Sequence, residues 1–221
     1  MALAAVLAWA AFSAAQGSPE DLLKEKLRSP FLAKAPWLTD YDRAREACRG
    51  SGKPILAYFT ESFVPSPGCS QVESGVLESR DFPRMAERFV LLCHITSRAP
   101  GEKYQSLLSE KGGRSWPSVL FLDADGNVLA RHSGPFTVEV FEATGTKPRE
   151  YLELKSRAEK GGAASKIDFA LAGLELGLLR PGEAEDRIRQ SGGAPSPDQK
   201  RRLDELLTNV EVESILKAIK T

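Results

Sequence analysis

Two short, continuous apolar segments most constrain how this chain can fold. Residues 55–60 (ILAYFT) and 89–96 (FVLLCHIT) contain no Asp, Glu, Lys or Arg, and such runs are typical of strands that are covered on both faces. Between them, Val72 and Val76 follow Cys69 at three and seven residues, which is the spacing of one helix face. The sequence therefore predicts a strand, a loop, a helix and a second strand.

Further segments complete an α/β pattern. A third strand over residues 118–123 turns through Asp125-Gly126-Asn127 into a fourth over 128–131, which predicts an antiparallel hairpin. Helical spacing occurs before the first strand, between the second and third, and after the fourth, at residues 39–48, 103–111 and 148–158. The predicted order is a leading helix followed by βαβαββα, with a central mixed sheet flanked by helices.

The pattern changes at Gly161-Gly162. Beyond this point a helical stripe ends at Pro181-Gly182, and a capping box at residues 196–199 opens another helix. Its apolar spacing continues to Ile215 and Ile219. We expect residues 161–221 to form a small, all-helical appendage that packs against the rest, since its stripes are too short to bury themselves.

The amino terminus predicts export. Residues 1–15 are uncharged and apolar, and Ser13 and Ala15 have the spacing that a signal peptidase reads. This run is shorter than the roughly 20 residues of a membrane anchor, so we expect cleavage near Gln16 and membrane contact only during export. No Lys or Arg precedes it, which leaves a mis-assigned start or a buried Ala-rich helix as alternatives.

The mature protein should be periplasmic or secreted and should begin with a leader segment over residues 16–35, helical from Ser18 to about Leu27. Thirty basic and thirty acidic side chains balance, which argues against nucleic acid as a partner. Three cysteines permit at most one internal disulfide. His94 and His132 have no cysteine or carboxylate at ligand spacing, so we expect no metal and no cofactor.

Four segments are more informative together than singly. They are Lys53-Pro54-Ile55-Leu56, Phe59-Thr60-Glu61-Ser62 leading to Cys69, Phe89-Val90-Leu91-Leu92, and the run from Trp116-Pro117 to Asp123. In this order they resemble the thioredoxin superfamily, especially its exported, disulfide-isomerase-like branch. The resemblance covers residues 36–160 and implies a thioredoxin-like domain there.

The resemblance also implies a degenerate active site. In the family a Cys-x-x-Cys motif begins the helix after the first strand, where the helix dipole stabilises a thiolate. Counting back from Val76 places Cys69 at the second cysteine and Ser66 at the first, after a one-residue loop insertion, so the motif reads Ser-Pro-Gly-Cys. A serine cannot join a disulfide, and we favour Ser66 as an N-cap that accepts the N–H of Cys69.

Two more features of the family site bear on chemistry. Cys93 lies on the neighbouring strand, at a position that faces the active-site helix in relatives, and is either a substitute partner for Cys69 or a buried free thiol. Ala57 stands at about the place where relatives carry a buried acid. Cys48, on a predicted helix face, should be a small core residue.

Pro117 occupies the place of the family's cis-proline, which presents backbone to an extended peptide. Trp116 replaces the usual small or β-branched residue, and provides either a flat contact for a bound chain or core packing.

These features leave two functions open. One is a weak or specialised thiol–disulfide protein that acts on protein substrates through Cys69, with Cys93 or a partner's cysteine. The other is a non-enzymatic module that binds peptide or protein over Trp116-Pro117, with the appendage as a partner surface or docking element. We expect no insulin reductase activity, and faster thiol labelling at Cys69 than at Cys48. Resistance of Cys69 to labelling until the protein is denatured would favour the binding module.

Overall fold

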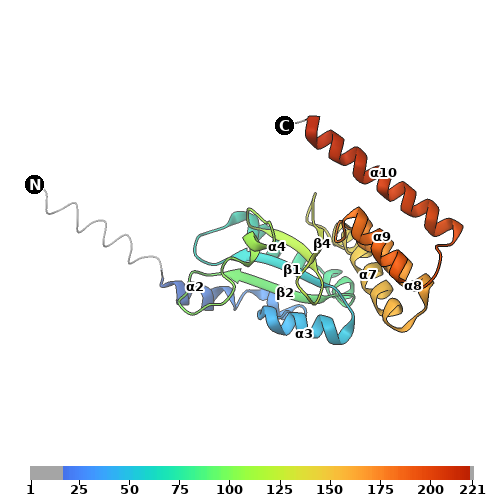
Figure 1. Cartoon of the computed structure of the whole chain (residues 1–221). Coiled ribbons are helices and arrows are strands. Elements are labelled where there is room, and N and C mark those ends of the chain that lie inside the picture. Colours follow the sequence, from blue (N-terminus) through green and yellow to red (C-terminus); the bar gives the residue numbers. More distant parts are fainter. Residues whose placement is uncertain (1–16, 220–221) are drawn as a thin grey trace, which may run out of the picture.

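A computed structural model describes residues 17–219 of the chain (Figure 1). The predicted signal peptide, residues 1–15, lies outside the described residues. In the predicted leader segment the structure has helix α2 (Pro19–Lys26) and the 3-10 helix η1 (Pro30–Ala33). Ser18 caps α2 by accepting the backbone N–H of Asp21 at 3.2 Å, as its sequence predicts.

The core of the structure is a mixed sheet of four strands in the order β2-β1-β3-β4. Strand β1 (Ile55–Glu61) pairs in parallel with β2 (Val90–Thr96) and antiparallel with β3 (Ser118–Leu122). Strand β4 (Val128–Arg131) pairs antiparallel with β3. The predicted strand order, the parallel crossover and the hairpin are therefore present.

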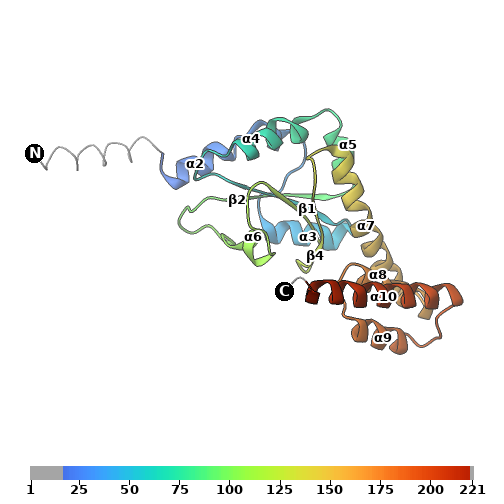
Figure 2. The ribbon, with the colours of Figure 1, turned by 90° about the horizontal axis from the view of Figure 1, so that it is seen from above.

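Helices cover both faces of this sheet (Figure 2). Because successive side chains of a strand point to opposite faces, Leu56 and Tyr58 of β1 join a core with α4 (Pro67–Ser74) and α5 (Phe82–Ala86). The intervening Ile55, Ala57 and Phe59 join a second core with α3 (Tyr41–Ser51) and α6 (Leu107–Glu110). All seven residues of β1 are buried, which explains its continuous apolar sequence.

Three predicted helices have other limits. The helix after the loop stops at Ser74, because Gly75 leaves helical geometry, and Val76 begins the 3-10 turn η2 (Val76–Glu78). The helix expected over 103–111 is reduced to α6, since Tyr104 has a positive φ of 61°. Helix α7 (Val138–Lys160) begins well before Pro148. Thr137 caps its start, because the hydroxyl of Thr137 accepts the backbone N–H of Val140.

The appendage contains α8 (Ala163–Glu175), α9 (Pro181–Gln190) and α10 (Pro197–Ile219). It has a small core of its own, formed by Ile167, Ala170, Leu171 and Ile188 with Leu203 and Leu206. It also packs on the thioredoxin-like part through the rings of Tyr151 and Phe169, 5.0 Å apart, and through Leu176 and Leu178. The expected inward continuation of α10 is wrong at its end, where Ile215 and Ile219 are exposed.

Helix α7 lies so close to the sheet that only glycine fits at residue 145. A Cβ there would lie 2.9 Å from Cε1 of Phe121 and closer still to the ring of Phe89. We expect Gly145→Ala to lower the free energy of unfolding by about 1–3 kcal/mol through overpacking. A Cβ at the exposed Gly182 of α9 would meet nothing within 4 Å. Gly182→Ala is therefore the matched control and should be neutral or stabilising in urea unfolding.

Candidate functional site

The first turn of α4 lies against the loop that precedes β3. Pro67 begins the helix, where its missing N–H and fixed φ are tolerated. The peptide bond between Trp116 and Pro117 is cis, as the resemblance predicts. A Cβ on Gly68 would lie 3.2 Å from Cδ of Pro117, so a small residue allows this close approach. The loop, α4 and the cis-proline thus meet as the sequence implies.

The structure buries Cys69 completely. Its side chain has 0 % exposure and lies on the sheet-facing side of α4, with no disulfide bond. A thiol must be reached by its target to react, whatever the effect of the helix dipole on its charge. The expected fast labelling of Cys69 relative to Cys48, whose exposure is 2 %, therefore has no support in the geometry.

The other two thiols are also free and buried. Cys93 is opposite Tyr58 in the β1–β2 register and joins the core on the α4 side, where it was expected. Burial raises the pKa of Cys93 strongly, and the nearby Glu73 carboxylate raises it further. Burial also raises the pKa of Cys48 to about 11. Both groups are neutral thiols at neutral pH.

Ser66 is at the N-cap of α4 but does not cap it. Its backbone is extended, and its side chain makes no capping hydrogen bond, so the predicted bond from the N–H of Cys69 is wrong. The side chain instead lines a cavity together with Ser62 and Ser70.

Sequence reasoning missed a buried acid, Glu73. Its carboxylate accepts hydrogen bonds from the hydroxyls of Tyr58 at 2.8 Å and Thr60 at 2.9 Å, both on β1. It also pairs with Nζ of Lys26 on α2, at 2.6 and 2.8 Å to its two oxygens. Only 8 % of Glu73 is exposed. Its position four residues after Cys69, on the same helix face, was the available signal.

This acid does not replace the family's acid on the strand. Ala57, which stands there, packs in the core on the α3 side of the sheet, away from Cys69. Glu73 is fully used in holding α2, α4 and β1 together. Glu73 is therefore not free to take a proton from Cys69.

Trp116 forms a half-buried aromatic surface beside the cis-proline. Its ring lies edge-on to Phe63, with centroids 5.8 Å apart, and the guanidinium of Arg98 lies 3.8 Å above the Phe63 ring. Within residues 17–219, neither the backbone N–H nor the carbonyl oxygen of Trp116 has a hydrogen-bond partner. The ring also packs against the core on the α3 side, and its indole N–H is buried without a hydrogen-bond partner, so core packing accounts for the buried part of the ring.

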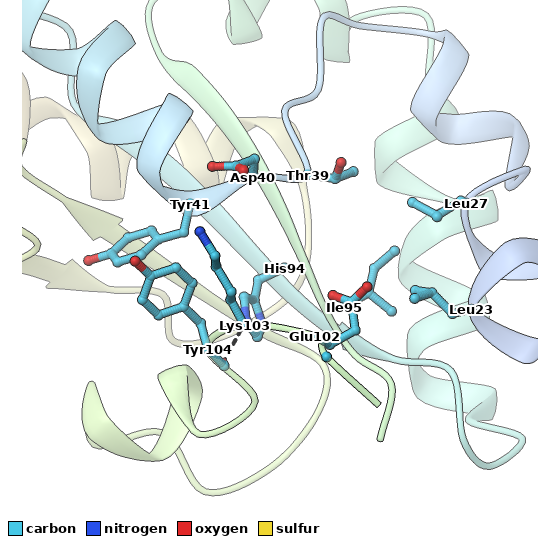
Figure 3. A pocket seen from close by; sticks show the side chains of 11 residues that line it. Leu23, Leu27, Thr39, Asp40, Tyr41, His94, Ile95, Glu102, Lys103 and Tyr104 are labelled. Atoms are coloured by element: carbon cyan, nitrogen blue, oxygen red, sulfur yellow. Dashed lines mark hydrogen bonds between the residues drawn. The ribbon is translucent and has the colours of Figure 1, made fainter. Parts of the chain in front are cut away.

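A separate cavity of about 320 Å³ lies at the outer edge of β2 (Figure 3). His94 lines it and donates from Nε2 to the carbonyl oxygen of Tyr104 at 3.0 Å. Burial lowers the pKa of His94, which keeps the ring neutral. No group of three or more His, Cys, Asp or Glu side chains within residues 17–219 is arranged to hold a metal ion.

A comparison of the chain with protein families agrees with the observed fold. The model of a thioredoxin-like domain matches residues 41–147. The described structure over these residues has a thioredoxin-like fold. The comparison with curated proteins gave no match. Every helix within residues 17–219 is too short or too polar to cross a bilayer.

A comparison with solved structures found matches at low identity. An oxidoreductase named DsbH is 24% identical, with 44% of this chain and 71% of that chain covered and a TM-score of 0.39. A thioredoxin from Thermus thermophilus is 22% identical, with 57% and 92% covered and a TM-score of 0.40. The DsbD C-terminal domain of Neisseria meningitidis is 18% identical, with 49% and 98% covered and a TM-score of 0.39.

The Lys26–Glu73 pair should contribute strongly to stability. Their side chains are 15% and 10% exposed, so Lys26→Met would leave a buried carboxylate without its cation. We expect a loss of about 3–5 kcal/mol in the free energy of unfolding, measured by urea denaturation.

The matched control for this change is Lys24→Met on the same helix. Lys24 is 67% exposed and pairs only with Asp21 on the surface, so its replacement should leave the urea midpoint unchanged. Equal midpoints for the two variants would contradict the importance of the buried pair.

Proposed function

We propose that this protein binds extended or unfolded polypeptide over the Trp116-Pro117 loop and does not turn over disulfides. One observation carries the proposal: Cys69 is completely buried, while Ser66 stands in the place of the family's attacking cysteine. The cis-proline loop would be the surface for a peptide, while the thiols of all three cysteines are buried.

The proposal follows from what each function requires. Thiol–disulfide exchange needs a thiolate that approaches a disulfide sulfur. Here that would require α4 to open, because Cys69 lies beneath it and Cys93 lies deeper on β2. Weak or specialised exchange at Cys69 is therefore the less favoured function. Peptide binding needs only the surface that already faces outward.

Three groups would contact the bound chain. The free backbone N–H and carbonyl of Trp116 would pair with its main chain, in the manner of an added strand. The Trp116 and Phe63 rings would provide apolar contact at low cost in side-chain entropy. Arg98, stacked on Phe63, would keep that ring in place.

We also propose that the protein acts after export, in the periplasm or outside the cell. The uncharged apolar segment over residues 1–15, with Ser13 and Ala15 at signal-peptidase spacing, supports this location. Its partners there would be polypeptides that are not yet folded.

Binding can be measured by the fluorescence anisotropy of labelled, reduced and carboxymethylated α-lactalbumin, which is unfolded and has no free thiol. We expect Trp116→Ala to weaken binding about tenfold, as the loss of a central aromatic contact does. Cys69→Ala, a buried change outside the surface, should leave the affinity unchanged. Equal affinity in the Trp116→Ala variant and the wild type would refute the proposed surface.

Thiol chemistry provides a second measurement. In the native protein we expect Cys48, Cys69 and Cys93 all to resist a soluble disulfide reagent, and in denaturant all three to react, because each is buried. Insulin should not be reduced. Rapid native labelling that disappears in Cys69→Ser would instead support thiol–disulfide chemistry at Cys69.

A further inference from the structure

A cavity of about 250 Å³ lies between the leader helix α2 and the loop that follows β1. Glu61, the last residue of β1, lines this cavity and is only 9 % exposed. Within residues 17–219 its carboxylate has no ion pair and no hydrogen bond. The adjacent Ser62 hydroxyl is also buried without a partner. Two neighbouring polar groups are thus left without protein partners in one cavity.

The cavity is negatively charged. Its lining contains three carboxylates, of Glu25, Glu61 and Glu73, and one ammonium group, of Lys26. Lys26 is already paired with Glu73 at 2.6 and 2.8 Å, so it does not neutralise Glu61. Glu25 is exposed at the rim. The net charge of the lining favours a cation.

The remaining lining fits a long basic side chain. Serine hydroxyls of residues 29, 62, 66 and 70 would accept the other N–H groups of a guanidinium or ammonium. Leu22, Val64 and Pro65 would cover its aliphatic stem. The Glu61 carboxylate has no partner within residues 17–219, and a charged donor binds a carboxylate more strongly than a neutral donor does.

We propose that this cavity binds an arginine or lysine side chain of the polypeptide held at Trp116-Pro117. This inference rests on the proposed function and adds a preference for basic residues to it. The two surfaces lie on either side of one loop: Val64 and Pro65 line the cavity, while Phe63 contacts Trp116. An extended chain at the cis-proline would place a nearby basic residue at Glu61.

The cavity can be tested without the polypeptide. The probe is N-acetylargininamide, titrated into the ¹⁵N-labelled full chain, with N-acetylcitrullinamide as its neutral isostere. We expect the amide signals of residues 61–64 and 66 to shift with the arginine compound. The citrulline compound should bind with at least about fivefold lower affinity, as the loss of a charge-assisted pair implies.

Matched variants identify the carboxylate. Glu61→Gln should weaken argininamide binding at least about fivefold, whereas Glu46→Gln, exposed on α3 at the other face of the sheet, should have no effect. Glu61→Asp keeps the charge and should retain part of the affinity, which separates loss of charge from loss of fold. Binding of both compounds with equal affinity, or an unchanged affinity in Glu61→Gln, overturns the basic-residue site.

The same variants applied to carboxymethylated α-lactalbumin separate the two proposals. Weaker binding in Glu61→Gln, together with the argininamide response, supports both. Polypeptide that binds wild type and Glu61→Gln equally overturns this inference and leaves the proposed function standing. An argininamide response without any binding of polypeptide contradicts the proposed function and overturns the link between the cavity and a bound chain.

Discussion

The ion pair between Lys26 and Glu73 holds the site together. It joins the leader helix to α4, and the hydroxyls of Tyr58 and Thr60 connect the same carboxylate to the central strand. Two buried charges are tolerated because the carboxylate accepts hydrogen bonds from Lys26, Tyr58 and Thr60. A residue of the leader helix thereby holds α4, the helix that begins at Pro67.

This arrangement also accounts for the low reactivity that we expect of the thiols. Glu73 is the acid nearest to Cys93, and its negative charge raises the pKa of that thiol. With Lys26 and two hydroxyls already bound, Glu73 has no role left as a proton acceptor. Cys69 lies on the same face of α4 as Glu73. Through Glu73, this helix is held to β1 by Tyr58 and Thr60 and to α2 by Lys26. The interactions that stabilise the domain therefore also close its thiol site.

Much of the fold followed from the sequence, because buried strands and capped helices leave local patterns: the order of strands and helices along the chain and the β3–β4 hairpin were predicted in this way, and the cis peptide at Pro117 was implied by the family resemblance. The site was less accessible to this reasoning. Cys69 had the right position, but its exposure depends on α4 packing, and the cap expected from Ser66 is absent because its side chain lies in a cavity instead. Glu73 pairs with Lys26 across 47 residues, and no periodicity reveals such a contact.

Serine at residue 66 differs from a cysteine in two ways. A serine at residue 66 cannot attack a disulfide, yet its hydroxyl joins those of Ser62 and Ser70 around the cavity beside Glu61. A cysteine in that place would be a weak hydrogen-bonding group next to an unpaired carboxylate. Serine makes the wall polar and suited to a cation. Under the functions proposed above, this loop would bind polypeptide, with α2 as its support through the Lys26–Glu73 pair.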